Sequence, residues 1–464
     1  MSTGVLDDRG RIADALASGW RFAGLHAAKQ GTVVRTLLVD DAGRTRLESR
    51  PVTDGECASL VELAPAAGWD EREAHDLYGI GFAGHDPLRP LVDHDPNLAA
   101  WVTPVRGHDP YQIAVGPIHA GVIESGHFRF HVVGDRILHL DPRLFYKHRG
   151  LEQAAEGHSL TEGLAYIGRA CAACTVANTL AYTHACEETL GLDPTPELAR
   201  ARTILAELER TWNHLNDIGA ICAGVGFTPG NNHFAALTER ARRLNADLTG
   251  HRFLFATIEL GQSSLDLDWD AVRTARSRLD DLRDAFRVGW RALRFDHSFR
   301  DRLPGVGALS TADARSLGTV GPAARASGMP DDARAGTTRL AYDGFQPALQ
   351  ATPAGDVEAR LEQRAVELEQ TFTLLDELLA RPLRPALAHS GNPARPIGIG
   401  RVESPRGATH CILEQRDGRV ERVHLRTGSY ANWPSVAHAA ANNLLPDFPL
   451  INKSFELCYA CADR

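Results

Sequence analysis

Two pairs of cysteines, each spaced Cys-x-x-Cys, constrain this chain more than any other feature of its sequence. The first pair is Cys171 and Cys174, and the second is Cys458 and Cys461, close to the last residue of the sequence. One such pair brings two sulfur atoms close together, so it can bind one metal ion or one side of a cluster. If the fold brings both pairs together, they offer four thiolates to a single site.

The separation of the two pairs in the sequence argues against the common roles of Cys-x-x-Cys pairs. Cys174 and Cys458 are 284 positions apart, whereas a structural zinc ribbon usually places its pairs within about 15–20 residues of each other. A thioredoxin-like pair would need a βαβ context, which is absent here. A single Cys-x-x-Cys pair, taken alone, could equally be two buried cysteines that bind nothing. A pair so near the end of a sequence has little packing reason to exist, because chain ends fray. The separation therefore favours a buried site that the last residues close.

Composition narrows the class of protein. The 464 residues include 50 basic and 59 acidic side chains, which give a formal net charge of −9. This charge argues against non-specific nucleic-acid binding as the main role, and 43% hydrophobic residues argue against wholesale disorder. We find no apolar stretch long enough for a transmembrane helix and no secretory signal. We therefore expect a reducing, cytoplasmic location without a disulfide framework.

The other four cysteines do not form a recognisable ligand set. They are Cys57, Cys186, Cys222 and Cys411, which are scattered singly through the sequence. We expect them to be buried thiols that pack like small hydrophobic residues.

The pattern predicts an α+β fold: a small N-terminal α+β domain, then a large, mainly helical domain with flanking strands. Residues 1–95 form the first domain, with a helix over 10–17, two strands around the turn at 41–43 and a helix over 69–77. Residues 96–112 are a linker. Residues 113–464 form the second domain, which begins with strands and a tight turn at 134–135.

Apolar residues recur at helical spacing in five long segments of the second domain, over 160–190, 195–221, 233–260, 268–293 and 360–380. Residues 301–345 are rich in Gly, Ala and Asp, which predicts loops with short helices. Strand and hairpin patterns return over 396–430, and a last helix is predicted over 435–445.

Several motifs resemble a known family. They are GPIHAGVIESGHFRF (116–130), HRGLE (148–152), RACAAC (169–174), LERTWNHLNDIGAICAGVGFTPGN (208–231), ESPRGA (403–408) and SFELCYAC (454–461). With them, residues 113–464 resemble the large subunit of complex-I-related, membrane-associated group 4 [NiFe] hydrogenases, such as that of formate hydrogenlyase, and the 49-kDa subunit of complex I. The segment 69–92 is similar to the 30-kDa subunit of complex I, which implies that the N-terminal domain is a docking module.

The resemblance implies a catalytic subunit that interconverts H₂ with two protons and two electrons. In the family, four thiolates hold a nickel and an iron, which here implies Cys171, Cys174, Cys458 and Cys461 as the ligands. Cys171 and Cys458 would be terminal on nickel, and Cys174 and Cys461 would bridge to iron. The iron of the family also carries carbon monoxide (CO) and cyanide (CN) ligands. Soft thiolates suit both metals.

Two further residues match catalytic positions of the family. Glu124 matches a glutamate that relays a proton from a cysteine sulfur, for which a raised pKa would be useful; the alternative is a surface glutamate at a strand edge. A second Glu-Gly-His sequence begins at Glu156 but lies outside that context. Arg406 matches an arginine above the open metal position, where its permanent charge could polarise a ligand; the alternative is a surface arginine after a turn.

Five other positions have weaker assignments. Glu152 matches a glutamate that supports a magnesium ion (Mg²⁺) in many relatives, although their C-terminal histidine ligand is replaced by Arg464. His119 falls in a loop that complex I uses for quinone, or it is a hydrogen-bonded core histidine. Arg169 offsets thiolate charge or forms a simple ion pair. His214 and Asp217 are structural or support the site from behind the ligands.

The sequence departs from the family pattern around both pairs. Ala172 stands where glycine is usual, and Asn178 stands where a histidine is frequent. Glu456-Leu457 replaces the usual Asp-Pro, and the longer carboxylate of Glu456 could still accept a hydrogen bond from Arg406 with a shifted geometry. These changes affect oxygen tolerance and catalytic bias, but they remove none of the thiolates.

The resemblance also implies partners. Because no further cysteine set exists for an iron–sulfur cluster in this chain, electrons would pass to an iron–sulfur small subunit like the PSST subunit of complex I. Other complex-I-like subunits, some of them in the membrane, would hold the chain peripherally on the inner face of the cell membrane. No nucleic-acid partner is expected.

Two alternatives remain open at this stage. One is a nickel-free NADH or quinone oxidoreductase subunit, similar to the 49-kDa subunit, in which the cysteines are relics. The other is a non-catalytic scaffold with structural zinc at the four cysteines. The complex I homologue lost the cysteines and uses the vacated cavity for quinone, so the presence of both pairs favours a metal site.

Overall fold

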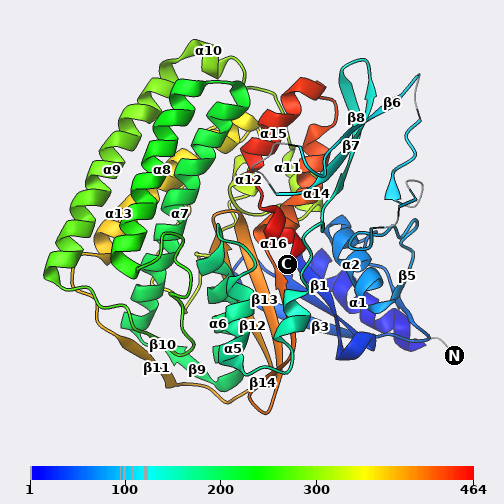
Figure 1. The fold of residues 1–464 in the computed structure, drawn as a ribbon. Helices are drawn as coiled ribbons and strands as arrows, with labels where there is room; N and C mark the ends of the chain where they lie inside the picture. Colours follow the sequence, from blue (N-terminus) through cyan, green and yellow to red (C-terminus); the bar gives the residue numbers. More distant parts are fainter. Residues whose placement is uncertain (1–2, 95, 98–100, 107–108, 120–123) are drawn as a thin grey trace.

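The computed structural model describes residues 3–94, 96–97, 101–106, 109–119 and 124–464, and its fold is drawn in Figure 1. Helices and strands are mixed along the whole chain, which confirms the predicted α+β class. Residues 98–100 and 107–108 of the predicted linker lie outside the described residues, as do residues 120–123 of the motif at 116–130. The proposed division of the chain at residues 95 and 112 remains a prediction.

The N-terminal part is built on a three-stranded antiparallel sheet against which two helices pack. Its elements are α1 (Thr3–Ala17), β1 (Arg21–Ala28), β2 (Val33–Val39), β3 (Thr45–Pro51) and α2 (Gly68–Tyr78). The predicted hairpin is confirmed, because Val39 pairs with Thr45 across the turn at 40–44. Ile12, Leu25 and Val34 are fully or almost fully buried between the sheet and its helices.

A second antiparallel sheet, with strand order β6-β7-β8, follows the N-terminal part. Its strands are β6 (Tyr111–Val115), β7 (His127–Val133) and β8 (Arg136–Arg143), and the predicted turn at 134–135 joins the last two. The rings of Phe128 and Phe130 lie 5.2 and 4.7 Å, centroid to centroid, from the ring of Phe448. The sheet therefore packs on the C-terminal helices, which are α14 (Gly428–Ala440), α15 (Phe448–Phe455) and α16 (Tyr459–Asp463).

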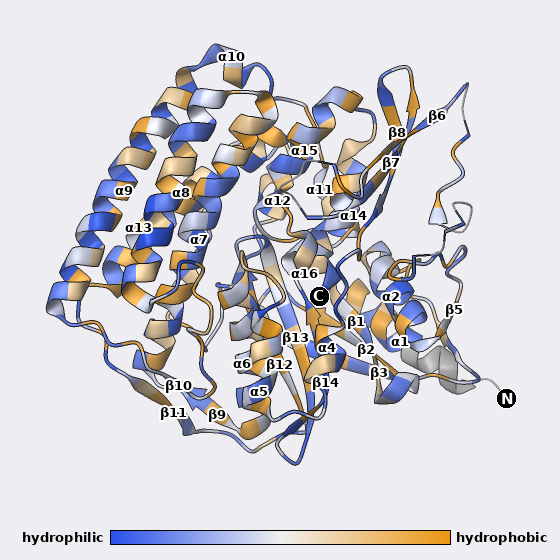
Figure 2. Ribbon diagram, viewed as in Figure 1, coloured by the Kyte–Doolittle hydropathy of each residue, from blue (hydrophilic) through white to orange (hydrophobic). Residues whose placement is uncertain are grey.

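Four long helices form a bundle on one side of the molecule, at the left of Figure 1. They are α7 (Pro196–Val225), α8 (Thr228–Thr249), α9 (Trp269–Phe295) and α13 (Val357–Leu378). Helix α9 buries residues at every third or fourth position, including Val272, Leu279 and Phe286, which is the stripe expected of a helix packed on one side. Figure 2 shows hydrophilic and hydrophobic residues mixed along it. Helix α7 is buried over most of its length, so it is the centre of this part.

A third antiparallel sheet lies between the bundle and the N-terminal part. It consists of β12 (Ile397–Ser404), β13 (Gly407–Arg416) and β14 (Arg419–Arg426). Helix α6 (Thr175–Leu190) packs directly on β12. This close approach depends on two glycines: an added Cβ would lie 2.0 Å from the carbonyl oxygen of Ala185 at Gly398, and 1.7 Å from that of Ala181 at Gly400.

Shorter elements complete the described chain. They are η1 (Lys29–Gly31), β4 (Glu56–Ala58), η2 (Pro65–Ala67), β5 (Gly81–Ala83), α4 (Leu151–Ala155), α5 (Leu160–Gly168), β9 (Leu192–Pro194), β10 (Gln262–Ser263), α10 (His297–Arg300), α11 (Thr311–Ser316), α12 (Gly321–Ala326), β11 (Ala386–Ser390) and η3 (Leu445–Asp447). Within the part of the chain that the structure describes, no helix combines the length and apolar character needed to cross a bilayer.

The prediction of one continuous helix over 160–190 is wrong. The structure has α5 and α6 instead, and the segment between them contains the first cysteine pair. The carboxylate of Glu209 accepts hydrogen bonds from the backbone N–H groups of Val176 and Ala177, at 2.6 and 3.1 Å. These donors lie in the first turn of α6, so a side chain of another helix satisfies them and a new helix begins here.

Two other predicted helices have wrong boundaries. The helix predicted over 233–260 ends at Thr249, because Gly250 adopts a left-handed conformation with φ of 79°. The helix predicted over 435–445 is α14, which begins seven residues earlier. Its N-cap Thr427 accepts a hydrogen bond from the backbone N–H of Tyr430, and Pro434 lies inside the helix. A proline inside a helix is the feature that misplaces the start in a sequence-based prediction.

The contact between α6 and β12 generates a prediction for stability. We expect Gly400→Ala to lower the free energy of unfolding by about 3 kcal/mol, because the methyl group would overlap the carbonyl oxygen of Ala181. The measurement is the midpoint of urea unfolding. Gly10→Ala is the matched control, since nothing lies within 4 Å of its added Cβ, and it should be neutral or slightly stabilising. Equal midpoints for the two variants would contradict the packing described here.

Candidate metal centre

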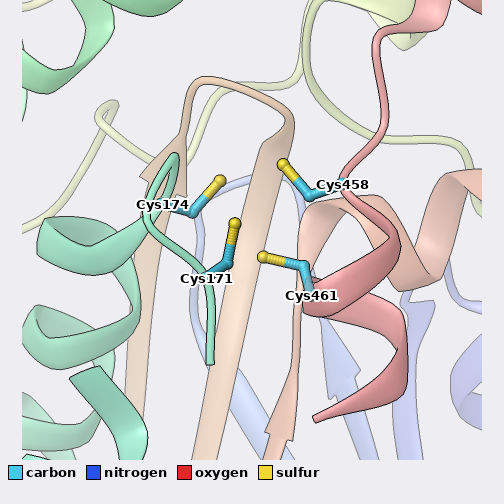
Figure 3. A group of neighbouring side chains, drawn as sticks. All are labelled: Cys171, Cys174, Cys458 and Cys461. Carbon is cyan, nitrogen blue, oxygen red and sulfur yellow. The ribbon is translucent and has the colours of Figure 1, made fainter. Parts of the chain in front are cut away.

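The four cysteines of the two pairs meet at one point. Cys171 and Cys174 lie in the segment between α5 and α6, and Cys458 and Cys461 lie at the start of α16. Figure 3 shows the four sulfur atoms directed toward one another, and all four lie within 4.8 Å of each other. Cys171, Cys174 and Cys461 are buried, while Cys458 is partly exposed. The fold therefore brings together two cysteine pairs that are 284 positions apart in the sequence.

The segment that carries the first pair is held by hydrogen bonds to its backbone. The side-chain amide of Asn213 donates to the carbonyl oxygen of Ala173 at 2.8 Å. The guanidinium of Arg149 donates to the carbonyl oxygens of Arg169 and Ala170, both at 2.9 Å. With Glu209 at the start of α6, these contacts fix both ends of the segment, so the two thiols keep one orientation.

The segment that carries the second pair is held in the same way. The backbone N–H of Cys458 donates to Ser429 Oγ at 3.0 Å, and the hydroxyl of Thr427 donates to the carbonyl oxygen of Cys461 at 2.9 Å. The carboxylate of Glu124 accepts a hydrogen bond from the backbone N–H of Ala460 at 2.7 Å. Ala460 lies between the two cysteines, so Glu124 is placed beside this pair.

The electrostatics of the group favour a bound cation. The neighbouring thiols, Cys171 first, hydrogen-bond to Cys458 and hold its pKa well below the usual value. The thiol of Cys171 also makes the largest contribution to the raised pKa values of Cys174 and Cys461. Cys458 therefore ionises readily while Cys174 and Cys461 resist ionisation, because hydrogen bonds between the thiols favour the thiolate at Cys458 and the protonated thiol at the other two. Full ionisation needs positive charge at the centre, which a metal supplies.

Arg406 is the permanent cation next to this group. Burial alone would lower its pKa, but the negative charge of Asp217, followed by those of Cys458 and Cys174, raises it. Its guanidinium donates to Asp217 Oδ2 at 2.5 Å and to Asn213 Oδ1 at 3.1 Å. Asp217 also accepts from Arg364 at 3.0 Å. The side chain is thus oriented by α7 and is only 4% exposed.

The expected hydrogen bond between Glu456 and Arg406 is not among the contacts of the described residues. Glu456 Oε2 instead lies 3.7 Å from Lys453 Nζ, and Asp217 is the carboxylate that pairs with Arg406. Burial raises the pKa of Glu456 to about 7. The backbone at Glu456 is left-handed, with φ of 48°, a conformation that is uncommon for residues other than glycine.

Two predicted residues do lie against the cysteines. Glu124 contacts the second pair through Ala460, and burial raises the pKa of its carboxyl group. The side-chain amide of Asn178 donates to Cys461 Sγ at 3.8 Å, a distance typical of a hydrogen bond to sulfur. Asn178 is fully buried, so it offers a donor to a thiolate at the position where the family frequently has histidine.

Three predicted residues have other surroundings. The ring of His119 lies 5.8 Å, centroid to centroid, from that of Phe128, and burial lowers its pKa. The exposed guanidinium of Arg169 lies 5.0 Å from the ring centroid of Phe255. His214 is fully buried, and its Nε2 lies 2.9 Å from Glu367 Oε2.

Glu152 belongs to a second group of possible metal ligands. The group consists of Glu73, Glu152 and His424, and all three residues are buried. Each residue offers one ligand atom, and the three atoms lie within 4.8 Å of one another. Glu73 comes from the N-terminal part, so the pairing of Glu152 with this residue does not follow from any single motif.

Sequence reasoning named Asp217 as structural or supporting, but it missed Glu209 and Asn213 on the same helix. Glu209, Asn213 and Asp217 respectively cap α6, hold the first cysteine segment and orient Arg406. They are spaced four residues apart, which puts them on one face of a helix. This spacing of three polar residues was the signal that could have found them, although α7 buries other polar residues as well.

Comparisons with known proteins identify relatives of both parts of the chain. The family described as "Respiratory-chain NADH dehydrogenase, 30 Kd subunit" matches residues 14–112, and "Respiratory-chain NADH dehydrogenase, 49 Kd subunit" matches residues 226–395. The chain thus joins two regions that each resemble a complex I subunit, as the motifs predict.

The similar proteins include hydrogenase subunits. Formate hydrogenlyase subunit 5 of Escherichia coli (strain K12) is 29% identical over 439 residues, which cover 88% of this chain and 77% of that protein. The carbon monoxide-induced hydrogenase of Rhodospirillum rubrum is 29% identical over 360 residues, covering 76% and 99%. NADH-quinone oxidoreductase subunits also match.

Among solved structures, a chain of the membrane-bound sulfane sulfur reductase, an archaeal respiratory membrane complex, has the same fold. The TM-score is 0.70 at 25% identity, over 77% of this chain and 99% of that chain. The resemblance predicted from the motifs is confirmed.

Glu209 generates a prediction for pH dependence. Burial raises its pKa to about 8, whereas an unfolded glutamate has a pKa of about 4.3. Between these values the folded protein binds a proton that the unfolded chain releases, so stability falls as pH rises through this window. We expect Glu209→Gln, which cannot ionise, to flatten the decline in the urea midpoint between pH 5 and pH 8. The exposed Glu377→Gln is the control and should keep the wild-type slope; the same slope in both variants would contradict the assignment.

Proposed function

This chain resembles the large subunits of complex-I-related hydrogenases, and we propose that it is the catalytic subunit of a [NiFe] hydrogenase. The observation that carries the proposal is the buried group of four cysteine thiols, all within 4.8 Å of one another. Relatives named as hydrogenases, 29% identical over most of the chain, support the same conclusion. The reaction would be the reversible conversion of H₂ into two protons and two electrons.

The donor set suits the proposed centre. Four soft thiolates favour nickel and iron over hard cations. Cys171, Cys174, Cys458 and Cys461 would hold the nickel and the iron. When bound, this centre would supply the site at which H₂ is converted into two protons and two electrons. The remaining chemistry depends on residues of the chain.

Glu124 is the residue best placed to move the proton. Its carboxylate already accepts the backbone N–H of Ala460, which holds it beside Cys458 and Cys461. Burial raises its pKa, and the charge of Cys458 raises it further. A carboxyl group with a raised pKa can both take a proton from a sulfur and release it. The partly exposed position of Glu124 allows exchange toward solvent.

Arg406 and Asn178 stabilise negative charge on the sulfur atoms. Arg406 cannot lose its proton in this setting, so its charge offsets the thiolates at any working pH. Asn178 donates to Cys461 Sγ. Because Asp217 and Asn213 fix the guanidinium of Arg406, it keeps its orientation while charge at the centre changes.

Electrons would leave through a partner. Cys57, Cys186, Cys222 and Cys411 are buried thiols, as predicted, and none joins a group of possible metal ligands in the described part of the chain. An iron–sulfur subunit must therefore exchange the electrons. A relative named as a subunit of a membrane-bound hydrogenase and the archaeal respiratory membrane complex support a location at a membrane. The chain would be held there by partner subunits, on the cytoplasmic side.

Two observations favour other functions for the same group. Four cysteines are also the ligand set of structural zinc, which would make the chain a scaffold. The matching NADH-quinone oxidoreductase subunits allow a nickel-free quinone-linked subunit. Metal content separates the three possibilities, since they predict nickel with iron, zinc, or no metal at the four thiols.

The proposed centre generates a prediction for metal binding. We expect about one nickel per chain in protein purified anaerobically from its native host, measured by mass spectrometry. Cys458→Ala removes one of four ligands, so nickel content and hydrogen oxidation should fall by at least about 100-fold.

Cys57→Ala is the matched control, because that thiol lies in the core of the N-terminal part. It should keep the nickel. Stoichiometric zinc without nickel in the wild type would contradict the proposal and favour the scaffold. Absence of both metals from fully matured protein would favour the quinone-linked subunit.

The proposed role of Glu124 in proton transfer generates a prediction for the rate. We expect Glu124→Gln to keep the nickel and to slow hydrogen oxidation by about 10²–10⁴-fold, because the amide cannot carry the proton. The assay is hydrogen oxidation with an artificial electron acceptor. Glu156→Gln, in the second Glu-Gly-His sequence, should leave the rate unchanged. Equal rates in both variants would remove Glu124 from the proton route.

A further inference from the structure

The group formed by Glu73, Glu152 and His424 has the composition of a metal site. Two carboxylates and an imidazole come from three different elements, α2, α4 and β14, and all are buried. Buried carboxylates are costly unless a cation accompanies them. The resemblance predicts that this cation is Mg²⁺ at Glu152.

The side chain of Arg464 already lies between the two carboxylates. Its Nη1 donates to Glu152 Oε1 at 3.0 Å and to the carbonyl oxygen of Leu425 at 2.7 Å. Its Nη2 forms an ion pair with Glu73 Oε2. The guanidinium carbon lies 4.7 Å from the ring centroid of Tyr430, and the residue is only 3% exposed. Both terminal nitrogens of this side chain therefore contact a carboxylate of the group.

The charges balance without a metal ion. Two carboxylates face two guanidinium groups, because Arg422 Nη1 lies 3.5 Å from Glu152 Oε2. Burial would raise the pKa of Glu152, but Arg464 first, then His424 and Arg422, hold it well below its usual value. His424 stacks on the neutral, buried His26, with ring centroids 5.1 Å apart. A divalent ion would compete with Arg464 for the same carboxylate oxygens and would leave the group with excess positive charge.

Mg²⁺ also requires a geometry that this group does not offer. It demands near-octahedral oxygen coordination and usually keeps several waters, whereas the space between the two carboxylates holds a planar guanidinium. The residues present therefore do not fit the magnesium ion that the resemblance implies.

We propose that the guanidinium of Arg464 takes the place of the metal ion at Glu73 and Glu152. The site is a metal-free cation site whose cation is supplied by the chain itself. This assignment is independent of which metal the four cysteines bind, because it concerns a separate group of ligands.

The contacts of Arg464 also hold the second cysteine pair in place. Arg464 follows Cys461 by three residues, and its partners come from the N-terminal part and from α4. The neighbouring Asp463 accepts the backbone N–H groups of Phe145 and Lys147, at 2.7 and 3.0 Å. Arg464 is therefore a positioning residue that ties the second cysteine pair to the N-terminal part, a task that a metal ligand at this position would otherwise perform.

The test uses Mn²⁺, a paramagnetic substitute for Mg²⁺, with the full chain and electron paramagnetic resonance. We expect the wild type to bind no Mn²⁺ at this group. Arg464→Gln leaves both carboxylates short of a cation, so it should unfold at a lower urea concentration and bind about one Mn²⁺ per chain. Millimolar Mg²⁺ should restore its stability. The additional change Glu73→Gln should abolish that binding.

Two variants serve as controls. Arg464→Lys keeps the positive charge and should exclude Mn²⁺ like the wild type. Arg384→Gln removes an exposed ion pair with Asp266 and should neither bind Mn²⁺ nor respond to Mg²⁺. The lysine variant remains informative if Arg464→Gln fails to fold.

Two results would overturn the proposal. One is a wild-type chain that binds one Mn²⁺ and loses it on Glu152→Gln. The other is an Arg464→Gln variant that matches the wild type in stability and binds no Mn²⁺. Neither depends on hydrogen turnover, so failure here is distinguishable from failure of the proposed function.

Discussion

The buried convergence of four thiols is the constraint on which the rest of the structure depends. Bringing Cys171 and Cys174 within 4.8 Å of Cys458 and Cys461 requires that the end of the sequence enter the core beside a break between two helices. Four thiolates at one point repel each other, and burial removes the water that would screen them. The surroundings respond with a permanent cation at Arg406, an amide donor at Asn178 and hydrogen bonds to the backbone of both cysteine segments.

Helix α7 and the C-terminal residues hold this arrangement from opposite sides. Glu209, Asn213 and Asp217 on one face of α7 fix the start of α6, the first cysteine segment and Arg406. On the other side, Asp463 and Arg464 attach the end of α16 to residues far away in the sequence. The geometry of the thiols is therefore set by buried polar contacts on both sides. Such contacts are strong in a low-dielectric interior, so losing one of them is costly.

Much of this could be predicted from the sequence, and the failures have physical causes. The two Cys-x-x-Cys pairs, the hairpin at 33–51 and the bundle helices follow from spacing and periodicity. The break at 169–174 could not be predicted from periodicity, because Glu209 lies on another helix and supplies the cap through space. For the same reason, the partner of Arg406 is Asp217, while the nearby motif indicates Glu456. The role of Arg464 required knowing that Glu73, almost four hundred residues earlier in the chain, lies beside it.

The central claim is that the four cysteines bind a nickel–iron centre. The most direct test is the infrared spectrum of the chain purified anaerobically from its native host, in the region where metal-bound cyanide and carbonyl absorb. Our account predicts such bands and predicts that they vanish when Cys171 is replaced by alanine. A fully matured chain without these bands, whose four cysteines hold zinc or no metal, would contradict it.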